Sequence, residues 1–315
     1  MKTIKLTHPH TLNLKELPET VTAIGFFDGI HKGHQKVINT AVNIAREKNM
    51  ESAVITFHPH PSVVLSKGKK KVNYITPPKE KQSILQNMSV DRLYIIEFNK
   101  DLAALSPQKF IDQFIIGLNI KHVVAGFDFT YGHKGQGNMT TIKEQTKNTF
   151  TYTTIDKVQL NNKKVSSTQI RELLKEGKIE QVNHLLRRPL SIHGVVVEGA
   201  RRGRKIGYPT ANLDVDKRAL LPKPGIYAVQ VIYKNKRFEG MASLGTNPTF
   251  TDNQNLSLEV NILDFNNDLY GEELKLEWYT FIRDEKKFKS ADELIEQIKE
   301  DEKVIRNYFS QKNNI

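Results

Sequence analysis

The pattern of apolar residues changes near residue 188, and this change restricts the possible folds more than any other feature of the chain. Upstream, short apolar runs alternate with segments of helical period, which is typical of a parallel sheet covered by helices; the runs are 21–26, 52–57, 92–96 and 122–125. Downstream, turn residues separate the apolar runs, which predicts antiparallel strands at 191–197, 226–233, 238–244, 256–265 and 274–281. We therefore predict an α/β domain over residues 1–185 and an antiparallel β-barrel domain over residues 186–315.

Helical period and capping residues predict four helices. The C-terminal one begins with a capping box, Ser290 with Glu293, and carries apolar residues at helical spacing as far as Phe309. The other three lie in the first 180 residues, around 37–45, over 107–117, and from 166 to a stop at Gly177.

The composition excludes several kinds of chemistry. The 315 residues include no cysteine, so disulfides, thiolate zinc clusters, iron–sulfur centres and a cysteine nucleophile are ruled out. No apolar run approaches 18 residues, and the first five residues lack the apolar stretch of a secretory signal. We expect a cytoplasmic protein without a membrane partner.

The chain is basic, with 47 Lys and Arg against 35 Asp and Glu, a formal net charge of +12. This surplus suits nucleic acid, a membrane surface or a small phosphorylated ligand. The lysine run at 67–71 contains no aromatic residue and that at 286–289 contains only Phe288, which is too little for a platform on which bases stack, so both are interpreted as solvated loops.

The segment 25–34, GFFDGIHKGH, lies between the first strand and the first helix, where open α/β sheets bind ligands. His31 and His34 are three residues apart at the helix N-terminus, so both can face a polyphosphate there, and Gly25 and Gly33 allow its close approach. Two alternatives stay open at this point: a metal pair completed by His58 or His60, and two surface histidines.

Three further segments could join the first site. Ser166, Ser167 and Thr168 with Arg171 offer hydroxyls and a guanidinium for an anion, although plain N-capping is the favoured explanation when this motif is taken alone. The segments 56–61 and 126–132 follow the second and fourth strands and so reach the ligand-binding rim. Taken alone, their aromatic residues suggest core positions and Asp128 suggests a loop cap.

A second candidate site lies in the barrel half. Glycines 199, 203 and 207 enclose a cationic segment before Pro209, which excludes a membrane helix and favours a basic loop around phosphates. Thr210 and Asn212 offer the oxygen donors that Mg²⁺ prefers. Because no histidine follows His193 and the chain has no cysteine, Glu259 is the candidate general base, although its strand pattern alone would make it solvent-facing.

These motifs together resemble one family, the prokaryotic bifunctional riboflavin kinase and FAD synthetase, over nearly the whole chain. GFFDGIHKGH, TFHPHP, GFDFTYG and SSTQIR resemble its adenylyltransferase module. GVVVEGARRGRKIGYPTANL, LPKPGIYA, MASLGTNPTF, LEVNILDF and DLYGEELKLEWYTFIRDEKKF resemble its kinase module. The HxGH element alone indicates only the nucleotidyltransferase superfamily, whereas its combination with the GxxxGRxxGxPTAN element is far more specific.

The resemblance implies a Rossmann-like nucleotidyltransferase domain that joins FMN to the AMP part of ATP, releasing pyrophosphate, and a barrel that phosphorylates riboflavin with ATP and Mg²⁺. It implies catalytic roles for His31, His34 and Glu259, and a metal held by Thr210 and Asn212. The nucleotide-binding residues would be Gly25, Phe27, Asp28, Gly33, Ser166, Ser167, Thr168, Arg171, Gly199, Arg204, Gly207, Pro209 and Thr210. The flavin-binding residues would be His58, Pro59, Asp128, Phe129, Asn247 and Arg283.

Partners would then be riboflavin, FMN, FAD and ATP, with no nucleic acid, in a monomer or weak homo-oligomer. The chain departs from the family pattern at Phe26 and Ser243, where the family often has Asn, and at Asn261, where it often has His. One alternative is a nucleic-acid-binding protein built on a nucleotidyltransferase-like domain and a basic barrel. Another is an adenylyltransferase for a different acceptor with a degenerate second half. The barrel's cations concentrate at 201–205, which favours nucleotide phosphate over a nucleic-acid polymer.

Overall fold

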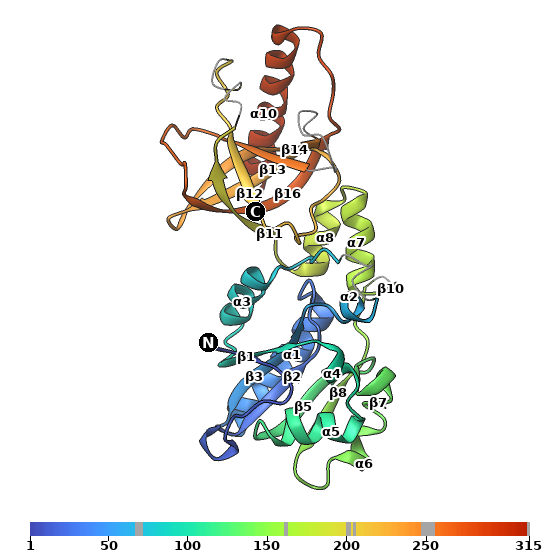
Figure 1. Cartoon of the computed structure of the whole chain (residues 1–315). Coiled ribbons are helices and arrows are strands. Elements are labelled where there is room, and N and C mark those ends of the chain that lie inside the picture. Colours follow the sequence, from blue (N-terminus) through green and yellow to red (C-terminus); the bar gives the residue numbers. More distant parts are fainter. Residues whose placement is uncertain (67–71, 161–162, 200–202, 204–205, 247–255, 314–315) are drawn as a thin grey trace. The chain divides into compact units, whose positions relative to one another are not determined.

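The structure is a computed structural model that describes residues 1–66, 72–160, 163–199, 203, 206–246 and 256–313 (Figure 1). The chain forms two compact units. The first comprises residues 1–74 and 81–166, and the second comprises residues 75–80 and 167–315. Each unit has its own sheet. The parallel sheet comes first along the chain and the barrel second, as the change of pattern near residue 188 predicts.

The first unit is built on a parallel sheet with strand order β1-β4-β3-β2-β5-β8. Its strands are β1 (Lys2–Leu6), β2 (Thr20–Ile24), β3 (Glu51–His58), β4 (Arg92–Glu97), β5 (Ile120–Gly126) and β8 (Thr151–Ile155). The four central strands confirm the predicted ones. The edge strands β1 and β8 were not predicted, because each has only one buried residue and lacks a continuous apolar run.

Helices cover both faces of this sheet. The main helix, α1 (Lys32–Glu47), follows β2 as predicted and buries Val37, Ile38, Ala41 and Ala45. The predicted helix 107–117 begins at Pro107 as α5 (Pro107–Ile111) but continues as a π-helical turn, η2 (Asp112–Ile116). The remaining short elements are η1 (Leu14–Glu16), α2 (Pro61–Leu65), α3 (Pro78–Asn87), α4 (Lys100–Ala103), β6 (Thr130–Tyr131), η3 (His133–Gly135), β7 (Gly137–Asn138), α6 (Ile142–Gln145), β9 (Gln159–Leu160) and β10 (Lys163–Lys164).

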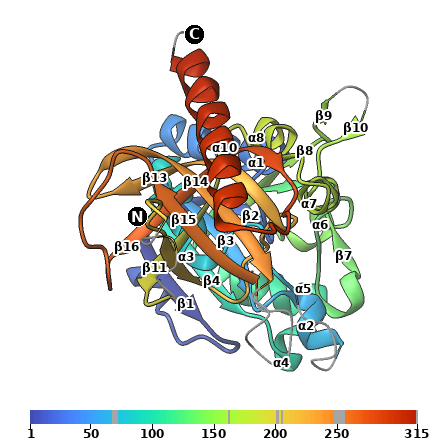
Figure 2. The ribbon, with the colours of Figure 1, turned by 90° about the horizontal axis from the view of Figure 1, so that it is seen from above.

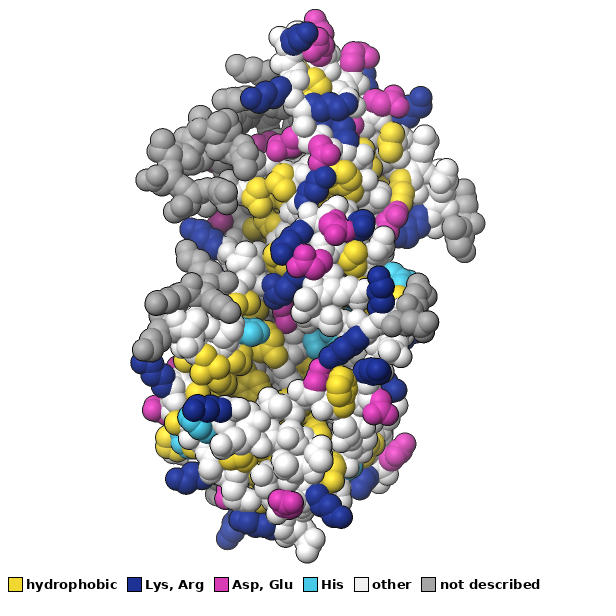
Figure 3. All heavy atoms as spheres, turned by 90° about the vertical axis from the view of Figure 1, so that its right-hand side faces the viewer, with side chains coloured by type: hydrophobic (Ala, Val, Ile, Leu, Met, Phe, Trp, Pro, Cys, Tyr) yellow, Lys and Arg dark blue, Asp and Glu magenta, His cyan; other side chains and the backbone are white. Residues whose placement is uncertain are grey.

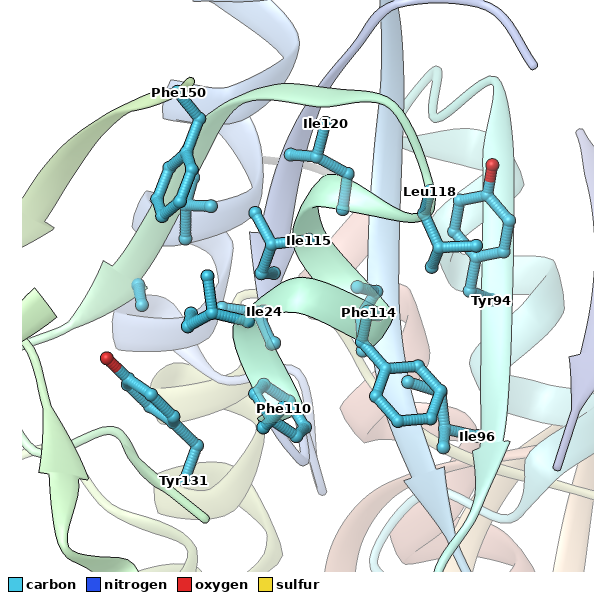
Figure 4. Close-up of a cluster of buried hydrophobic side chains, with 14 of the residues drawn as sticks. Ile24, Tyr94, Ile96, Phe110, Phe114, Ile115, Leu118, Ile120, Tyr131 and Phe150 are labelled. Carbon is cyan, nitrogen blue, oxygen red and sulfur yellow. The ribbon is translucent and has the colours of Figure 1, made fainter. Parts of the chain in front are cut away.

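Alternate residues of the strands feed two apolar clusters, one on each face. Val21 and Ala23 of β2 pack in the cluster that includes α1 residues such as Ile38. Ile24 belongs to the opposite cluster, where Phe110 and Phe114 of the α5–η2 segment cover the sheet (Figure 4). Because both faces are covered, the central strands are apolar throughout, which is what made them visible in the sequence.

The second unit is a closed antiparallel barrel with strand order β11-β12-β15-β14-β13-β16, closed by pairing of β11 with β16. Its strands are β11 (Leu190–Val197), β12 (Ala211–Val215), β13 (Gly225–Tyr233), β14 (Lys236–Thr246), β15 (Leu256–Ile262) and β16 (Glu273–Arg283). Trp278 and Tyr227 pack edge to face in its core, with ring centroids 5.0 Å apart. The barrel confirms the predicted fold class, although β12 was not predicted.

Helices flank the barrel. α7 (Ser167–Lys175) and α8 (Ile179–Leu186) precede it, and α10 (Ala291–Asn313) follows it. One half of the predicted capping box is confirmed, since the Glu293 N–H donates to Ser290 Oγ at 3.2 Å. The Glu293 carboxylate accepts the N–H of Lys289 at 2.9 Å, one residue before the expected donor. Ile305 and Phe309 of α10 pack on barrel residues that include Tyr279, and the helix contacts β14 and β16 (Figure 2).

Candidate active sites

A tight turn between β2 and α1 places the two predicted histidines of the first site. Three residues of this turn have positive φ: Phe27 (51°), Gly29 (89°) and Ile30 (43°). Such angles cost energy for Phe and Ile, and strained backbone of this kind is concentrated at functional sites. The turn ends with His31 as the N-cap of α1, so His31 and His34 stand at the positive end of the helix.

The two histidine rings stack on each other. Their centroids are 3.7 Å apart and their planes differ by 19°. His31 Nδ1 accepts the backbone N–H of His34 at 3.3 Å, so the neutral ring carries its proton on Nε2. A Cβ on Gly33 would lie 3.2 Å from the His31 ring, which explains why a glycine stands there.

The pKa of His34 is held well below its usual value, chiefly by burial and then by the positive charges of His31, Lys81 and Lys164. His34 is therefore neutral near pH 7. Its Nδ1 is shielded from solvent and has no hydrogen-bond partner among the described residues. The alternative of a metal pair gains no support, because the described ranges contain no group of three or more His, Cys, Asp or Glu placed to hold a metal ion.

An apolar cavity of about 940 Å³ adjoins the histidines. His34, Gly25 and Phe27 lie on its wall, and hydrophobic side chains gather on the face of this unit seen in Figure 3. The other phenylalanine and tyrosine residues of its lining are Phe26, Phe57, Phe98, Phe110, Phe129 and Tyr131. The volume is that of sites for drug-sized ligands, and the aromatic lining suits a planar ring system.

The predicted residues on the cavity rim have definite partners. The Asp128 carboxylate lies 2.7 Å from Lys164 Nζ, and both side chains are about half exposed. Asp128 and Phe129 line the cavity. His58 ends β3, with its ring centroid 5.9 Å from that of Tyr74, and Pro59 follows it.

Asp28 is buried beside the positive charge of Lys81. Ser167, Thr168 and Arg171 lie in α7, at the start of the segment that belongs to the second unit, whereas Ser166 ends the first unit. Thr168 is exposed, and Ser167 and Arg171 are partly buried. The predicted anion-binding motif therefore lies at the start of a helix.

In the second unit, β12 and β15 bring the predicted residues together. Asn212 pairs with Glu259 in the sheet register, and Thr210 Oγ1 donates to Glu259 Oε2 at 3.1 Å. A Cβ on Gly199 would lie 2.0 Å from Asn212 Nδ2, so only glycine fits there without displacing the amide. A hydroxyl, an amide and a carboxylate thus meet beside the glycine-rich segment.

A cavity of about 480 Å³ adjoins this cluster. Pro209, Thr210 and Ala211 form one wall, and the loop 265–270 forms another. The sequence did not predict this wall, because nothing in Asn266-Asn267-Asp268 distinguishes the wall of a cavity from an ordinary turn. In the first unit, Phe98 and Phe110 were not predicted to line the cavity, whereas Phe57 and Tyr131 lie in the segments 56–61 and 126–132 that were predicted to reach the ligand-binding rim.

The structure shows the environment of the three residues at which the chain departs from the pattern of the family that it resembles. Asn261 is buried, and its Nδ2 donates to the Pro209 carbonyl at 2.7 Å. Ser243 lies opposite Glu259 in the sheet. Phe26 lines the first cavity.

Arg283 is held by Asp301 of α10 through two hydrogen bonds from Nε, at 2.8 and 3.0 Å, and one from Nη2 at 2.7 Å. This ion pair gives it a structural partner in addition to its predicted role. Gly207 is exposed with φ 84°. The predicted Arg204 and Asn247, and most of the 199–207 loop, lie outside the described residues.

Histidines at a helix start above a parallel sheet, and a Thr–Asn–Glu cluster on a barrel, define a two-unit nucleotide-dependent transferase. The family model for FAD synthetase matches residues 13–169, and that for riboflavin kinase matches residues 186–309. A bifunctional riboflavin kinase/FMN adenylyltransferase from Bacillus subtilis (strain 168) is 45% identical over 312 residues, covering 98% of this chain and 99% of the relative. The relative of the same name from Listeria monocytogenes is 46% identical, with the same coverage, and that from Escherichia coli K12 is 33% identical, covering 98% of both chains.

The chain therefore belongs to the family of bifunctional riboflavin kinase/FMN adenylyltransferases. It is an enzyme with an FAD synthetase domain followed by a riboflavin kinase domain, and ATP is the co-substrate of both.

A crystal structure described as a macrolide-efflux protein from Streptococcus pneumoniae superposes with a TM-score of 0.87 at 36% identity, covering 98% of this chain and 99% of that one. The word efflux describes that protein and is not carried over to the present chain. In the part of the present chain that the structure describes, no helix has the length and apolar character needed to cross a membrane.

Proposed function

We propose that residues 1–185 transfer the adenylyl group of ATP to FMN and that residues 186–315 transfer the γ-phosphoryl group of ATP to riboflavin. One observation carries the assignment of sites: the stacked His31–His34 pair adjoins an apolar cavity in one unit, while the Thr210–Glu259 pair adjoins a separate cavity in the other. Each unit therefore has its own polar groups beside its own ligand space.

In the first site the isoalloxazine ring of FMN occupies the aromatic cavity, and its phosphate lies toward the histidines. A phosphate oxygen of FMN attacks the α-phosphorus of ATP, the bond from that phosphorus to the bridging oxygen breaks, and pyrophosphate leaves. His31 donates from Nε2. His34 is neutral, its buried Nδ1 has no hydrogen-bond partner in the described part of the chain, and it adds a second polar group. These groups stabilise the charge that builds on the phosphates.

Supporting roles in the first site follow from position. We assign Gly25, Phe27, Asp28 and Gly33 to the nucleotide, and His58, Pro59, Asp128 and Phe129 to the flavin. The motif formed by Ser166, Ser167, Thr168 and Arg171 is assigned to the ATP phosphates on its sequence and its helix start, and an Arg171→Ala variant with a raised KM for ATP in adenylyl transfer would support it.

In the second site Glu259 is the general base. Its carboxylate accepts the proton of the ribityl 5′-hydroxyl while that oxygen attacks the γ-phosphorus of ATP, and ADP leaves. Thr210 orients Glu259 by its hydrogen bond and borders the cavity that would hold the nucleotide. Gly199, Arg204, Gly207 and Pro209 are assigned to the nucleotide, and Asn247 and Arg283 to the flavin.

The oxygen donors of the second site fit Mg²⁺. Thr210 Oγ1 and the Asn212 amide are hard ligands, and Mg²⁺ usually takes few protein ligands together with substrate phosphates. When bound, it would neutralise phosphate charge. Thr210 and Asn212 would hold it, with the Asn212 amide kept in place against the backbone of Gly199.

Both reactions consume ATP, so we propose that the protein acts in the cytoplasm. We also propose that it is a monomer or a weak homo-oligomer. Cell fractionation and analytical ultracentrifugation test these two statements.

Two reciprocal variants test the assignment of sites. Glu259→Gln should lower FMN formation from riboflavin at least a hundredfold and leave FAD formation from supplied FMN within twofold, and His31→Gln should do the reverse. Glu239→Gln, a partly buried carboxylate elsewhere on the barrel, is the matched control and should change neither rate. If either site variant lowers both rates equally, the two-site assignment is wrong.

A further inference from the structure

The segment 208–210, which we call the phosphate-binding segment, is tied to the C-terminal helix. The hydroxyl of Tyr208 donates to Glu302 Oε2 of α10 at 3.1 Å. Burial and the neighbouring Glu302 raise the pKa of Tyr208, so the hydroxyl keeps the proton that it donates. Tyr208 directly precedes Pro209 and Thr210, so this hydrogen bond acts on the backbone that presents the Thr210 hydroxyl.

Glu302 is itself fixed by two further residues. Arg306 Nε donates to Glu302 Oε1 at 2.8 Å, and the two remaining nitrogens of its guanidinium contact the Asp264 carboxylate at 2.8 and 2.9 Å. Asp264 follows β15, the strand that carries Glu259. The acceptor of the Tyr208 hydroxyl is therefore anchored to the turn that follows the strand of the general base.

The phosphate-binding segment is held from its other side by the barrel. Asn261 Nδ2 donates to the Pro209 carbonyl at 2.7 Å, and Thr210 donates to Glu259. The N–H of Tyr208 also donates to the Gly203 carbonyl at 2.9 Å, so the position of Tyr208 sets that of the described part of the glycine-rich loop. Of these four contacts, those with Asn261, Glu259 and Gly203 come from the barrel strands and the glycine-rich loop, whereas the contact with Glu302 comes from α10.

We propose that Glu302 is a positioning residue of the riboflavin kinase site, acting through the Tyr208 hydroxyl to hold the phosphate-binding segment where it binds ATP. This inference deepens the proposed function and rests on the assignment of Thr210 to the nucleotide. In it, α10 contributes to ATP binding without touching ATP.

Tyr208→Phe isolates the contact, because it removes one hydroxyl and leaves Glu302, Arg306 and Asp264 paired. The KM for ATP in the kinase reaction should rise about three- to tenfold, the size expected for loss of a partly exposed hydrogen bond to a charged group, with kcat within twofold. Kinase flux is measured as FMN plus FAD, since the same chain consumes FMN. Adenylyl transfer from supplied FMN should not change, which provides a control within the same molecule.

Further variants separate positioning from stability. Glu302→Ala should raise the KM for ATP as much as Tyr208→Phe does, and the double variant should be no worse than either single one. Glu302→Gln, which keeps an acceptor for the hydroxyl, should recover part of the loss. Glu300→Ala, an exposed carboxylate on the same helix, should have no effect.

The outcomes distinguish the inference from the function on which it rests. Thr210→Val should damage the kinase reaction. If it does while Tyr208→Phe leaves the KM for ATP unchanged, or lowers both activities together, the positioning role of Glu302 is wrong. If Thr210→Val has no effect, the assignment of the phosphate-binding segment and the inference both fail.

Discussion

Lys81 Nζ donates to the main-chain carbonyl of Phe26 at 2.7 Å, in the turn that leads from β2 to His31. The same ammonium lies 3.1 Å from Thr56 Oγ1, which also donates to that carbonyl at 2.9 Å, and 4.8 Å from the centre of the Phe26 ring. Lys81 is only 7% exposed. A buried cation therefore holds the backbone at the start of the turn that leads to His31.

Burial lowers the pKa of Lys81 to about 8, against the opposing influence of Asp28. As the pH rises through about 8, Lys81 loses the charge that adds to the attraction for ATP phosphates. We expect kcat/KM for adenylyl transfer to fall above that pH while the kinase reaction does not follow the same curve. In Lys81→Met this alkaline limb should be absent and kcat/KM near pH 7 about tenfold lower.

Lys36→Met, on the exposed side of α1, is the matched control and should keep the wild-type pH profile. An unchanged alkaline limb in Lys81→Met would show that another group titrates.

The lowered pKa of His34 predicts how the stability of the first unit depends on pH. Above the usual histidine pKa of about 6.5 the ring is neutral in the folded and unfolded states and contributes no pH dependence. Below it, the unfolded state takes up a proton that the folded state excludes, so stability falls as the pH falls, by up to about 1.4 kcal/mol per pH unit.

His34→Gln should reduce this slope. Urea unfolding between pH 5 and 7, followed by circular dichroism, measures it. A slope equal to that of the wild type would mean that His34 is protonated in the folded protein at these pH values.

Two glycines stand against functional side chains, one in each unit. In Gly199→Ala the new methyl group must displace the Asn212 amide, which can move at small cost in stability but then leaves its proposed ligand position. We expect the kinase rate to fall ten- to a hundredfold, because small displacements of positioning groups have large effects on rate. In Gly33→Ala the methyl group meets the His31 ring, so adenylyl transfer should fall instead.

Each glycine variant serves as the control for the other when both reactions are assayed on both proteins. Equal effects on the two reactions would contradict the separation of sites.

The sequence could predict the features whose cause is local. Central strands buried on both faces are apolar throughout, and the histidine motif and the capping box are short patterns. β12 was missed because Pro209 and Thr210 read as a turn and because the strand then alternates polar Asn212 with Leu213. Lys81 gave no signal at all, since a lysine in a helix normally indicates a solvated face, and only the tertiary fold places it under the Phe26 carbonyl.

The pairing of Arg283 with Asp301 was likewise invisible, because the partner is 18 residues away on a helix. Their side chains are 14% and 3% exposed, so removing one charge leaves the other buried and unpaired. Asp301→Asn should lower the free energy of unfolding of the barrel by about 3 kcal/mol, the lower end for a broken buried pair, since the amide keeps one acceptor.

Trp278 is the one tryptophan of the chain and is buried in the barrel, so its fluorescence during urea unfolding reports on this unit alone. Asp264→Asn is the matched control, because its ion pair with Arg306 is well exposed and screened by water, and it should change stability much less. If the role of Arg283 is limited to its ion pair with Asp301, the folded Asp301→Asn protein should have the wild-type KM for riboflavin. A raised KM would instead support the proposed flavin contact of Arg283, because the freed guanidinium would have lost its position along with its partner.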